Sequence, residues 1–232
     1  PYKAMLVALS GGADSVVLLH ILVKQGIKCV AAHCNFHLRG EESNRDEAFV
    51  RDYCKRLNVE CRVKDFDTER YAAEKRVSIE MAARELRYSW FEKLLDEYDL
   101  PCVAVAHHAD DNTETFLLNL IRGTGIKGLC GMKSVNGRVV RPLLGYSRDS
   151  IEAYCKINHL KYVIDSTNQS DDYTRNRIRH HIVPAMKELN PSVLSTMNGN
   201  MTRLESILRI FQKQYDQFVS QAVEIRENGF EI

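Results

Sequence analysis

Several common sequence signatures are absent from this chain, and each absence excludes a class of protein. The seven cysteines are scattered, odd in number and free of any C-x-x-C pair, which argues against a disulfide framework, a zinc knuckle and a cysteine-ligated iron–sulfur cluster. No apolar run approaches the roughly 20 residues that span a bilayer, and no signal segment precedes the first predicted strand. We therefore expect a cytoplasmic protein without membrane contact.

Excess charge of one sign is also lacking, since the formal net charge is only +1. A nucleic-acid surface would therefore have to be a local basic patch. The hydrophobic fraction of 44% is that of a globular chain with a substantial core. The sequence opens with Pro1 and closes at Ile232 without an evident terminator, and we expect it to be a piece of a longer protein.

The chain does contain a regular alternation of short β-branched segments and longer helical patterns. This alternation is typical of βαβ units and predicts an α/β fold with a doubly wound, mostly parallel five-stranded sheet. The predicted strands cover residues 4–9, 28–33, 61–66, 102–106 and 139–144, with a further short strand at 162–164. The predicted helices cover residues 14–25, 43–57, 78–98, 110–122, 147–158 and 173–189, and a helical stretch begins at Thr68. Ser43 is the predicted cap of the second helix.

The pattern changes at Asn190-Pro191-Ser192, which breaks the chain. We expect residues 1–190 to form one nucleotide-binding catalytic domain. Residues 191–232 would then form a helical appendage, helical to about Glu227, that leads toward a further domain.

The strongest motif is the 10–15 loop, with the sequence Ser10-Gly11-Gly12-Ala13-Asp14-Ser15, which follows a predicted buried strand and opens a helix. Two glycines let the backbone turn and aim N–H groups at an anion, and the helix N-terminus adds partial positive charge. The serines add hydroxyl donors. The loop is therefore a candidate phosphate cradle, although it is neither a Walker A loop nor G-x-G-x-x-G. It is similar to SGGxDS, the PP-loop of ATP pyrophosphatases.

A second motif follows the fourth predicted strand, where His107 and His108 precede an acidic helix start. Asp111 and Glu114 are three residues apart and share a helical face, and Asp110 can cap the helix. A carboxylate pair suits a cation, either magnesium carrying ATP phosphates or a substrate amine. The alternative is that these acids only complement the helix dipole. Because ligands of open α/β sheets sit outside the carboxyl ends of strands, we favour a functional site.

The same rule selects the segment that follows the second predicted strand, which carries His33 and His37. A histidine considered alone is often structural. Functional and structural interpretations therefore stay open for both residues.

Two predicted helices carry pairs of arginines. Arg175 and Arg179 share a face at i,i+4, with Arg177 between them on another face. The shared face could meet phosphates or a substrate carboxylate. Arg84 and Arg87 lie three apart on the long helix and are similar candidates. For both pairs the alternative is a solvated or intrahelically paired surface.

Together these segments resemble the tRNA(Ile)-lysidine synthetase family within the PP-loop group. The resemblance covers nearly all of residues 4–190 and continues through residues 83–88, 122–125, 128–129, 141–144, 165–168 and 175–179. One departure concerns a second histidine that many members carry three residues after the first. Phe36 stands at that position here, and His37 follows it, so His37 receives no role.

The resemblance implies a two-step ligation on the wobble cytidine of an isoleucine tRNA with a CAU anticodon. The C2 oxygen of the base would attack the α-phosphate of ATP and release pyrophosphate, and the ε-amine of free lysine would then displace AMP. The implied partners are ATP, L-lysine and the tRNA, with Mg²⁺ as cofactor. A homodimer is left open.

Roles for individual residues follow from this implied reaction. Backbone donors of the 10–15 loop would stabilise pyrophosphate, and Asp14 would hold magnesium. His108 is a candidate base for deprotonating the amine. The expected ATP-binding residues are Ser10, Gly11, Gly12, Ala13, Asp14, Ser15, His33 and His107. The expected lysine-binding residues are Asp111, Glu114, Arg175 and Arg179. The expected tRNA-binding residues are Arg84, Arg87, Arg175, Arg177 and Arg179.

Two other functions remain open at this point. Another PP-loop chemistry is tRNA thiolation or amide ligation, but the missing C-x-x-C pair and the missing amino-terminal cysteine weaken these alternatives. A non-catalytic sensor of adenine nucleotides is the second alternative. The acidic residue of the 10–15 loop and the acidic pair count against it, because a sensor gains nothing from cleavage chemistry.

Overall fold

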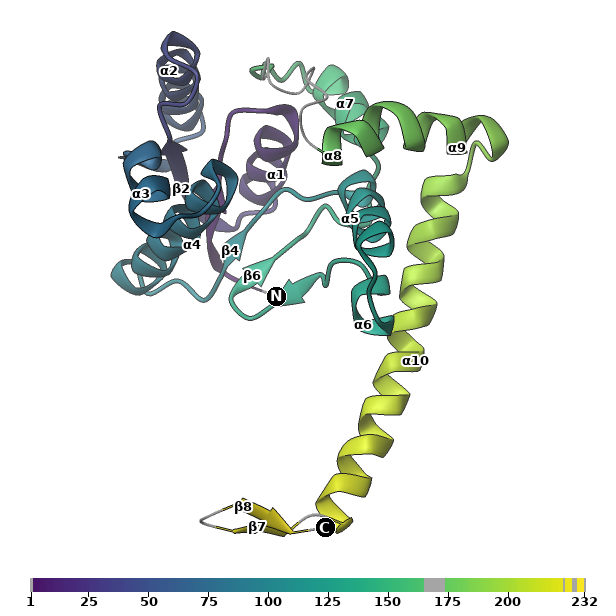
Figure 1. Cartoon of the computed structure of the whole chain (residues 1–232). Helices are drawn as coiled ribbons and strands as arrows, with labels where there is room; N and C mark the ends of the chain where they lie inside the picture. The colour runs from purple at the N-terminus through teal and green to yellow at the C-terminus, as the bar shows by residue number, and fades with distance from the viewer. Residues whose placement is uncertain (1, 165–173, 223, 227–228, 232) are drawn as a thin grey trace. The chain divides into compact units, whose positions relative to one another are not determined.

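The computed structural model describes residues 2–164, 174–222, 224–226 and 229–231 (Figure 1). The chain forms two compact units. The first unit contains residues 1–109 and 133–169, and the second contains residues 110–132 and 170–232. This division runs through the range 1–190 that the sequence pattern grouped together. The domain boundary near residue 190 therefore stays a prediction.

The first unit is built on a six-stranded sheet with the strand order β3-β2-β1-β4-β6-β5. The strands are β1 Ala4–Ala8, β2 Lys28–Asn35, β3 Glu60–Asp65, β4 Val103–Ala104, β5 Val135–Asn136 and β6 Val139–Val140. All neighbours pair in parallel except β5 and β6, which form an antiparallel hairpin at the edge. The predicted α/β class and the five predicted parallel strands are confirmed, and β5 is an addition that the sequence pattern did not indicate.

Helices cover both faces of this sheet because its buried strands are apolar on both sides. Val7 packs with α1 and α7, whereas its neighbour Leu6 packs with Phe91 and Leu94 of α4. The alternation follows from the two-residue period of a strand. The helices of the first unit are α1 Ala13–Lys24, α2 Glu41–Arg56, α3 Thr68–Lys75, α4 Ile79–Glu97 and α7 Arg148–Ile157.

Serine caps fix the starts of two of these helices. The Ser78 hydroxyl accepts a hydrogen bond from the backbone N–H of Met81, and the Ser147 hydroxyl does the same for Ser150. The predicted cap at Ser43 is wrong. The helix begins at Glu41 after Gly40, and Ser43 is buried with its hydroxyl accepting from the N–H of Arg39.

The predicted short strand at 162–164 is also wrong, because these residues belong to no ladder of the described sheet. The backbone N–H of Val163 instead donates to the carbonyl of Gly11 at 3.0 Å. This segment therefore supports the 10–15 loop. The resemblance segment at 165–168 lies outside the described residues.

The second unit is helical and packs around an apolar cluster that includes Leu117, Ile178 and Met201. Its helices are α5 Ala109–Arg122, α6 Ile126–Leu129, α8 Thr174–Arg177, the π-helix η2 Ile178–Ile182, α9 Val183–Leu189 and α10 Val193–Ala222. The helix predicted over 173–189 thus contains a π-helical segment. Pro184, which lacks the N–H that an α-helix uses, lies two residues after the end of that segment.

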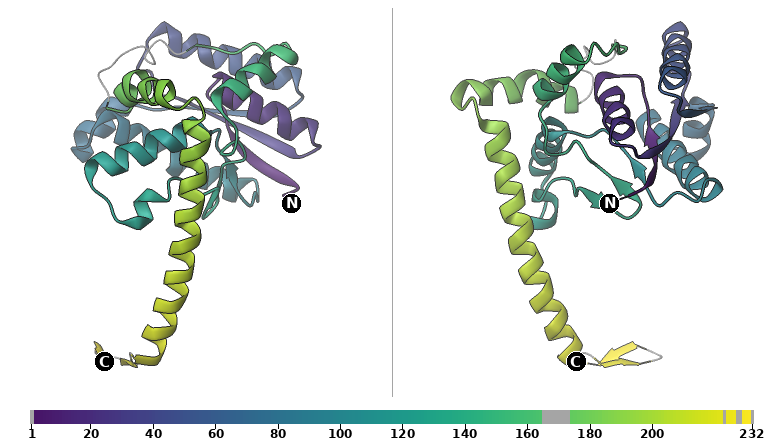
Figure 2. Two further views of the ribbon diagram at one scale, coloured as in Figure 1. Left: turned by 90° about the vertical axis from the view of Figure 1, so that its right-hand side faces the viewer. Right: turned by 180° about the vertical axis from the view of Figure 1, so that it is seen from behind.

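The long helix predicted from Val193 to about Glu227 is present but ends earlier than expected. Figure 2 shows α10 as one continuous helix that stops at Ala222. Strands β7 Glu224–Arg226 and β8 Gly229–Glu231 then form an antiparallel hairpin. Among the described helices, none is both long enough and apolar enough to cross a membrane.

Candidate active site

The 10–15 loop connects β1 to α1 and is held in shape by its own serines. The Ser15 hydroxyl accepts from the N–H groups of Ser10 and Gly11, both at 3.2 Å, and donates to the carbonyl of Gly12 at 3.0 Å. The Ser10 hydroxyl accepts from the N–H of Gly12 at 3.4 Å. The loop is therefore preorganised before any ligand binds. The first amides of α1 open beside it, as an anion cradle requires.

Gly11 is required at its position for two reasons. Its φ of +95° lies in the left-handed region that other residues rarely adopt, and an added Cβ would lie 2.9 Å from Cγ2 of Val163. The sequence pattern correctly identified a glycine turn. It could not identify the close contact with a segment more than a hundred residues away.

Asp14 faces a partner that the sequence analysis missed. One guanidinium nitrogen of Arg148 lies 2.8 and 2.6 Å from the two carboxylate oxygens of Asp14. Arg148 also donates through Nε to Glu152 at 2.9 Å. Partial burial acts to lower the pKa of Arg148, but the nearby carboxylates of Asp14 and Glu152 outweigh it and raise that pKa. The available signal was the position of Arg148 in the first turn of a predicted helix that follows the last parallel strand.

His108 lies behind the same carboxylate. Its side chain is buried, and Nε2 lies 3.8 Å from Oδ1 of Asp14. This distance is too long for a direct hydrogen bond and short enough for electrostatic interaction. The predicted base, His108, and the predicted metal ligand, Asp14, are thus neighbours in the first unit.

A cavity of about 250 Å³ opens beside the 10–15 loop. We call it the loop cavity. It is lined by Ala8, Leu9, Ser10, Asp14 and Ser15 near the loop, by Ala32, Cys34 and Phe36 of the second strand segment, by Arg84, Arg87, Tyr88 and Phe91 of α4, and by Val105, Ala106 and His107. Two residues predicted to bind tRNA, Arg84 and Arg87, therefore share a cavity with residues predicted to bind ATP.

His33 does not line the loop cavity. It is buried, and its Nδ1 lies 2.8 Å from the carbonyl of Leu9, directly before the 10–15 loop. Burial lowers the pKa of His33, and the hydrogen bond to Leu9 opposes that shift. The geometry supports a positioning role for this histidine beneath the loop, and direct ATP binding by His33 stays a prediction.

The departure from the family pattern concerns Phe36 and His37. The two side chains make different contacts. Phe36 lines the loop cavity, where its ring stacks on Phe66 and lies 5.3 Å from the guanidinium carbon of Arg87. His37 has a φ of +52° and bonds through Nε2 to Asp65 at 2.7 Å. The aromatic ring therefore takes the position beside the loop cavity.

His107 is fixed by Arg141. The Nε–H of Arg141 donates to Nδ1 of His107 at 3.2 Å, and another nitrogen of Arg141 donates to the carbonyl of Lys133 at 2.8 Å. Since Nδ1 accepts this bond, the ring carries its proton on Nε2 in this arrangement. Arg141 was noted only as part of the family resemblance.

The predicted lysine-binding residues come together in the second unit. The two carboxylate oxygens of Glu114 accept from Arg175 at 2.8 Å and from Arg179 at 2.6 and 2.9 Å. Asp111 lies 3.1 Å from Arg175 and 3.5 Å from Arg179. The Glu114 side chain is only 3% exposed, so its charge depends on these arginines. The prediction that Asp111 and Glu114 share one helical face, and that Arg175 and Arg179 share another, is confirmed. Arg177 is exposed and lies outside this cluster.

A buried amide network braces α5 on another face. Asn112 accepts from the N–H of Met132 and donates to Asn198 of α10 at 2.8 Å. Asn198 in turn donates to the hydroxyl of Thr113 at 3.2 Å. The sequence analysis missed this network because it joins residues far apart in the chain. It fixes the turn of α5 that carries the acidic pair.

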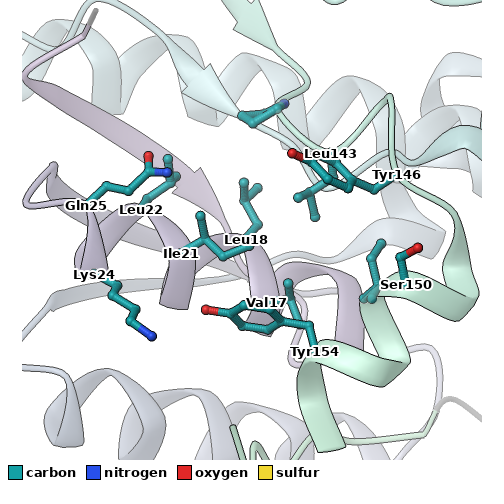
Figure 3. A pocket seen from close by; sticks show the side chains of 12 residues that line it. Val17, Leu18, Ile21, Leu22, Lys24, Gln25, Leu143, Tyr146, Ser150 and Tyr154 are labelled. Carbon is teal, nitrogen blue, oxygen red and sulfur yellow. The ribbon is translucent and has the colours of Figure 1, made fainter. Parts of the chain in front are cut away.

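Another cavity of the first unit, of about 780 Å³, contains none of the predicted site residues. Figure 3 shows Leu18 and Ile21 of α1 facing Leu143 across it, with Tyr154 of α7 at one side. Its lining is mainly apolar and offers no phosphate cradle. Although this cavity is larger than the loop cavity, we do not assign the active site to it.

The sequence pattern of the PP-loop domain matches residues 1–186. This chain belongs to the PP-loop domain family. Membership implies the use of ATP, and it accounts for the 10–15 loop as the PP-loop itself.

Curated relatives lie within the same family. The tRNA(Ile)-lysidine synthase of Bacteroides thetaiotaomicron is 54% identical over 94% of this chain and 51% of that protein. The tRNA(Ile)-lysidine synthase of Porphyromonas gingivalis is 52% identical over 97% of this chain and 51% of that protein. The resemblance predicted from the motifs is confirmed. The chain spans about half the length of these relatives.

Solved structures support the PP-loop fold. A tRNA thiolase from Methanococcus maripaludis superposes with a TM-score of 0.72 at 19% identity, over 88% of this chain and 73% of that one. The NMN synthetase of Francisella tularensis gives a TM-score of 0.56 at 13% identity, over 88% and 87% of the two chains. At these identities the likeness concerns the fold alone.

Proposed function

We propose that this chain carries the catalytic part of a tRNA(Ile)-lysidine synthase. It would adenylate the C2 oxygen of the wobble cytidine in the CAU-anticodon isoleucine tRNA and then ligate L-lysine to C2 with release of AMP. The observation that carries the proposal is the loop cavity, in which a phosphate cradle and two arginines face one space. Curated lysidine synthases about half identical to this chain support this function over thiolation or nucleotide sensing.

The first step joins the base to AMP. The C2 oxygen of the cytidine forms a bond to the α-phosphorus of ATP, and the bond to the bridging oxygen of pyrophosphate breaks. Negative charge develops on the departing pyrophosphate, where the PP-loop amides and the N-terminus of α1 donate.

Magnesium suits this site through Asp14. Mg²⁺ commonly binds one or two carboxylates together with substrate phosphates, and Asp14 supplies one carboxylate in the loop cavity. When bound, the metal would neutralise charge on the phosphates. Asp14 is paired with Arg148 in this structure, so metal binding would exchange one cation for another. Arg148 would then be placed beside the polyphosphate, where a guanidinium binds phosphate oxygens well.

The second step uses the arginine and carboxylate cluster of the second unit. L-lysine carries two ammonium groups and one carboxylate, and the cluster of Asp111, Glu114, Arg175 and Arg179 offers complementary charges of both signs. The acids would bind ammonium and the arginines the carboxylate. The ε-nitrogen then bonds to C2, AMP leaves, and the amine loses a proton. His108 is the proposed acceptor of that proton, and His107 a proposed ATP ligand.

The decisive experiment measures incorporation of labelled lysine into unmodified bulk tRNA, with and without ATP. ATP-dependent incorporation supports the proposal. Pyrophosphate release without lysine incorporation, together with sulfur transfer from a supplied donor, would support thiolation instead. ATP binding without any pyrophosphate release would identify a sensor. The proposal includes a cytoplasmic location and leaves a homodimer open.

A further inference from the structure

A second cavity, of about 480 Å³, lies next to the loop cavity in the first unit. We call it the outer pocket. It is lined by Met81, Arg84, Glu85 and Tyr88 of α4 and by Asn136, Val139 and Arg141 of the β5–β6 segment. Arg84 and Tyr88 line both cavities, so one wall separates them. A ligand in the outer pocket would therefore be a direct neighbour of a ligand in the loop cavity.

Two arginines of the outer pocket lack carboxylate partners. Among the described residues, no carboxylate lies within 4.0 Å of Arg84 or Arg141. Several other arginines of the first unit behave differently; Arg62 and Arg138, for example, each bind a glutamate or aspartate. Uncompensated guanidinium groups that face one cavity attract an anion.

The electrostatics of Arg141 support this interpretation. Burial lowers the pKa of Arg141, and the positive charge of Arg84 lowers it further. The two guanidinium groups therefore repel each other in a partly desolvated place. A bound anion would relieve that repulsion.

The rest of the lining is suited to a nucleotide rather than to a bare anion. The guanidinium carbon of Arg84 lies over the Tyr88 ring, 4.9 Å from its centre, so a flat cation and an aromatic ring lie together in the lining. Met81 and Val139 add apolar surface, and Asn136 adds an amide that can pair with the edge of a base. The one carboxylate, Glu85, accepts a hydrogen bond from the Tyr71 hydroxyl at 3.0 Å.

We propose that the outer pocket binds the RNA nucleotide adjacent to the target cytidine, with its phosphate between Arg84 and Arg141 and its base against Met81, Val139 and the Arg84 plane. This assignment rests on the proposed function. It adds Arg141 and Asn136 to the RNA-binding residues. It also explains why Arg84, which is expected to contact tRNA, lines the loop cavity as well, because the shared wall would hold the RNA while the target base reaches the nucleotide.

RNA binding without turnover tests this inference separately from the proposed function. A fluorescent RNA hairpin with a CAU anticodon loop would be titrated with the whole chain across a salt series, without ATP or lysine. We expect Arg141→Gln to weaken binding roughly tenfold or more and to lower the salt slope by about 1. Asn136→Ala should weaken binding without changing the slope. Arg62→Gln, which removes a carboxylate-paired arginine, is the matched control and should change neither.

Three outcomes would overturn the inference. One is unchanged RNA affinity in both pocket variants, and another is no measurable hairpin binding by the unmodified chain. The third is loss of ATP affinity in Arg141→Gln as large as its loss of RNA affinity, which would mean that Arg141 acts only through His107. Inorganic phosphate is added as a competitor of the RNA hairpin. If phosphate displaces the hairpin completely and Arg141→Gln leaves the salt slope of hairpin binding unchanged, the pocket is a site for free phosphate, and this result also contradicts the inference. Failure of lysine incorporation alone would instead count against the proposed function.

Discussion

Asp14 and Arg148 form an ion pair that changes how the PP-loop aspartate has to be understood. In this structure the carboxylate already has a cation, bound through both oxygens. Its charge is thus stabilised before the substrate arrives. The residue pattern of the loop predicted the importance of Asp14, but its partner comes from a helix that begins 134 positions later in the chain.

Asp14→Asn should abolish pyrophosphate release and leave the fold intact. The amide has the same shape, so packing is kept, but it loses the charge that would hold Mg²⁺ and that now binds Arg148. We expect a loss of about 10²-fold or more, the usual scale for removing one preorganised electrostatic contact. The measurement is pyrophosphate release with circular dichroism as the control for folding. Near-normal turnover in this variant would contradict a metal role for Asp14.

His33 should make stability depend on pH. Burial lowers its pKa in the folded chain below the unfolded value of about 6.5. The unfolded chain therefore binds the proton more readily, so the contribution is fully present above about pH 6.5 and declines as pH falls through the folded pKa. Urea unfolding at about pH 8 and about pH 5.5 should show a smaller acid-induced loss for His33→Asn than for the unmodified chain.

The matched control for this titration is His20. Its pKa is also lowered, by burial and by Lys24, and it bonds to the Tyr154 hydroxyl far from the PP-loop. His20→Gln should remove only the part of the pH dependence of stability that His20 contributes. The part that His33 contributes should remain. Identical pH dependence in His33→Asn and the unmodified chain would show that His33 does not titrate as inferred.

At the scale of elements, the sequence predicted the strands and most helices because their period and caps are local properties. The five parallel strands are of this kind, and so are the helices predicted over 78–98 and 147–158, whose starts the structure places at the capping serines Ser78 and Ser147. The predictions were wrong at positions whose structure depends on contacts with residues that are distant in the sequence. Ser43 is buried instead of capping a helix, and the segment around Val163 bonds to Gly11 instead of extending the sheet. The acidic pair and its arginines were each located from helical spacing, but their mutual ion pairs were not predictable.

The PP-loop backbone offers a prediction with a built-in comparison. Gly11 and Gly26 both have positive φ, but an added Cβ meets Val163 only at Gly11 and meets nothing within 4 Å at Gly26. Both alanine substitutions should cost about 1–2 kcal/mol of stability for the backbone conformation. Gly11→Ala should cost more and should also lose ATP affinity, measured by urea unfolding and calorimetry. Equal costs for the two variants would show that the contact with Val163 is easily relieved.

The acidic face of α5 should matter for the second step of the proposed reaction. Asp111→Asn and Glu114→Gln should impair lysine transfer more than adenylation, because neutral amides cannot compensate the desolvation of an ammonium group. Adenylation measured without lysine separates the steps. If both variants lose adenylation as severely as Asp14→Asn, the pair serves the nucleotide instead, and the cluster that it forms with Arg175 and Arg179 is not the lysine site.

At the scale of the whole molecule, charge and length both bear on RNA binding. The net charge of +1 leaves only local basic clusters, such as the outer pocket in the first unit and the arginines of α8 and η2 in the second. Composition alone predicted that basic surface for nucleic acid would be local and would not extend over the whole molecule. The positions of the individual arginines required the structure, since their carboxylate partners distinguish structural arginines from those that face a cavity.

This chain should bind ATP well and modify tRNA poorly. The PP-loop and the loop cavity lie within the first unit, so we expect this chain to contain the whole nucleotide site. Affinity for tRNA comes mainly from phosphate contacts over a large basic surface, and the curated relatives are about twice as long as this chain.

The test compares this chain with the whole Bacteroides thetaiotaomicron relative and with that relative cut to the matched region. ATP affinity should be similar in all three, measured by calorimetry. Affinity for tRNA across a salt series should be higher, with a steeper slope, only in the whole relative. Equal affinities and slopes for the whole and cut relatives would show that its other half adds nothing to RNA binding.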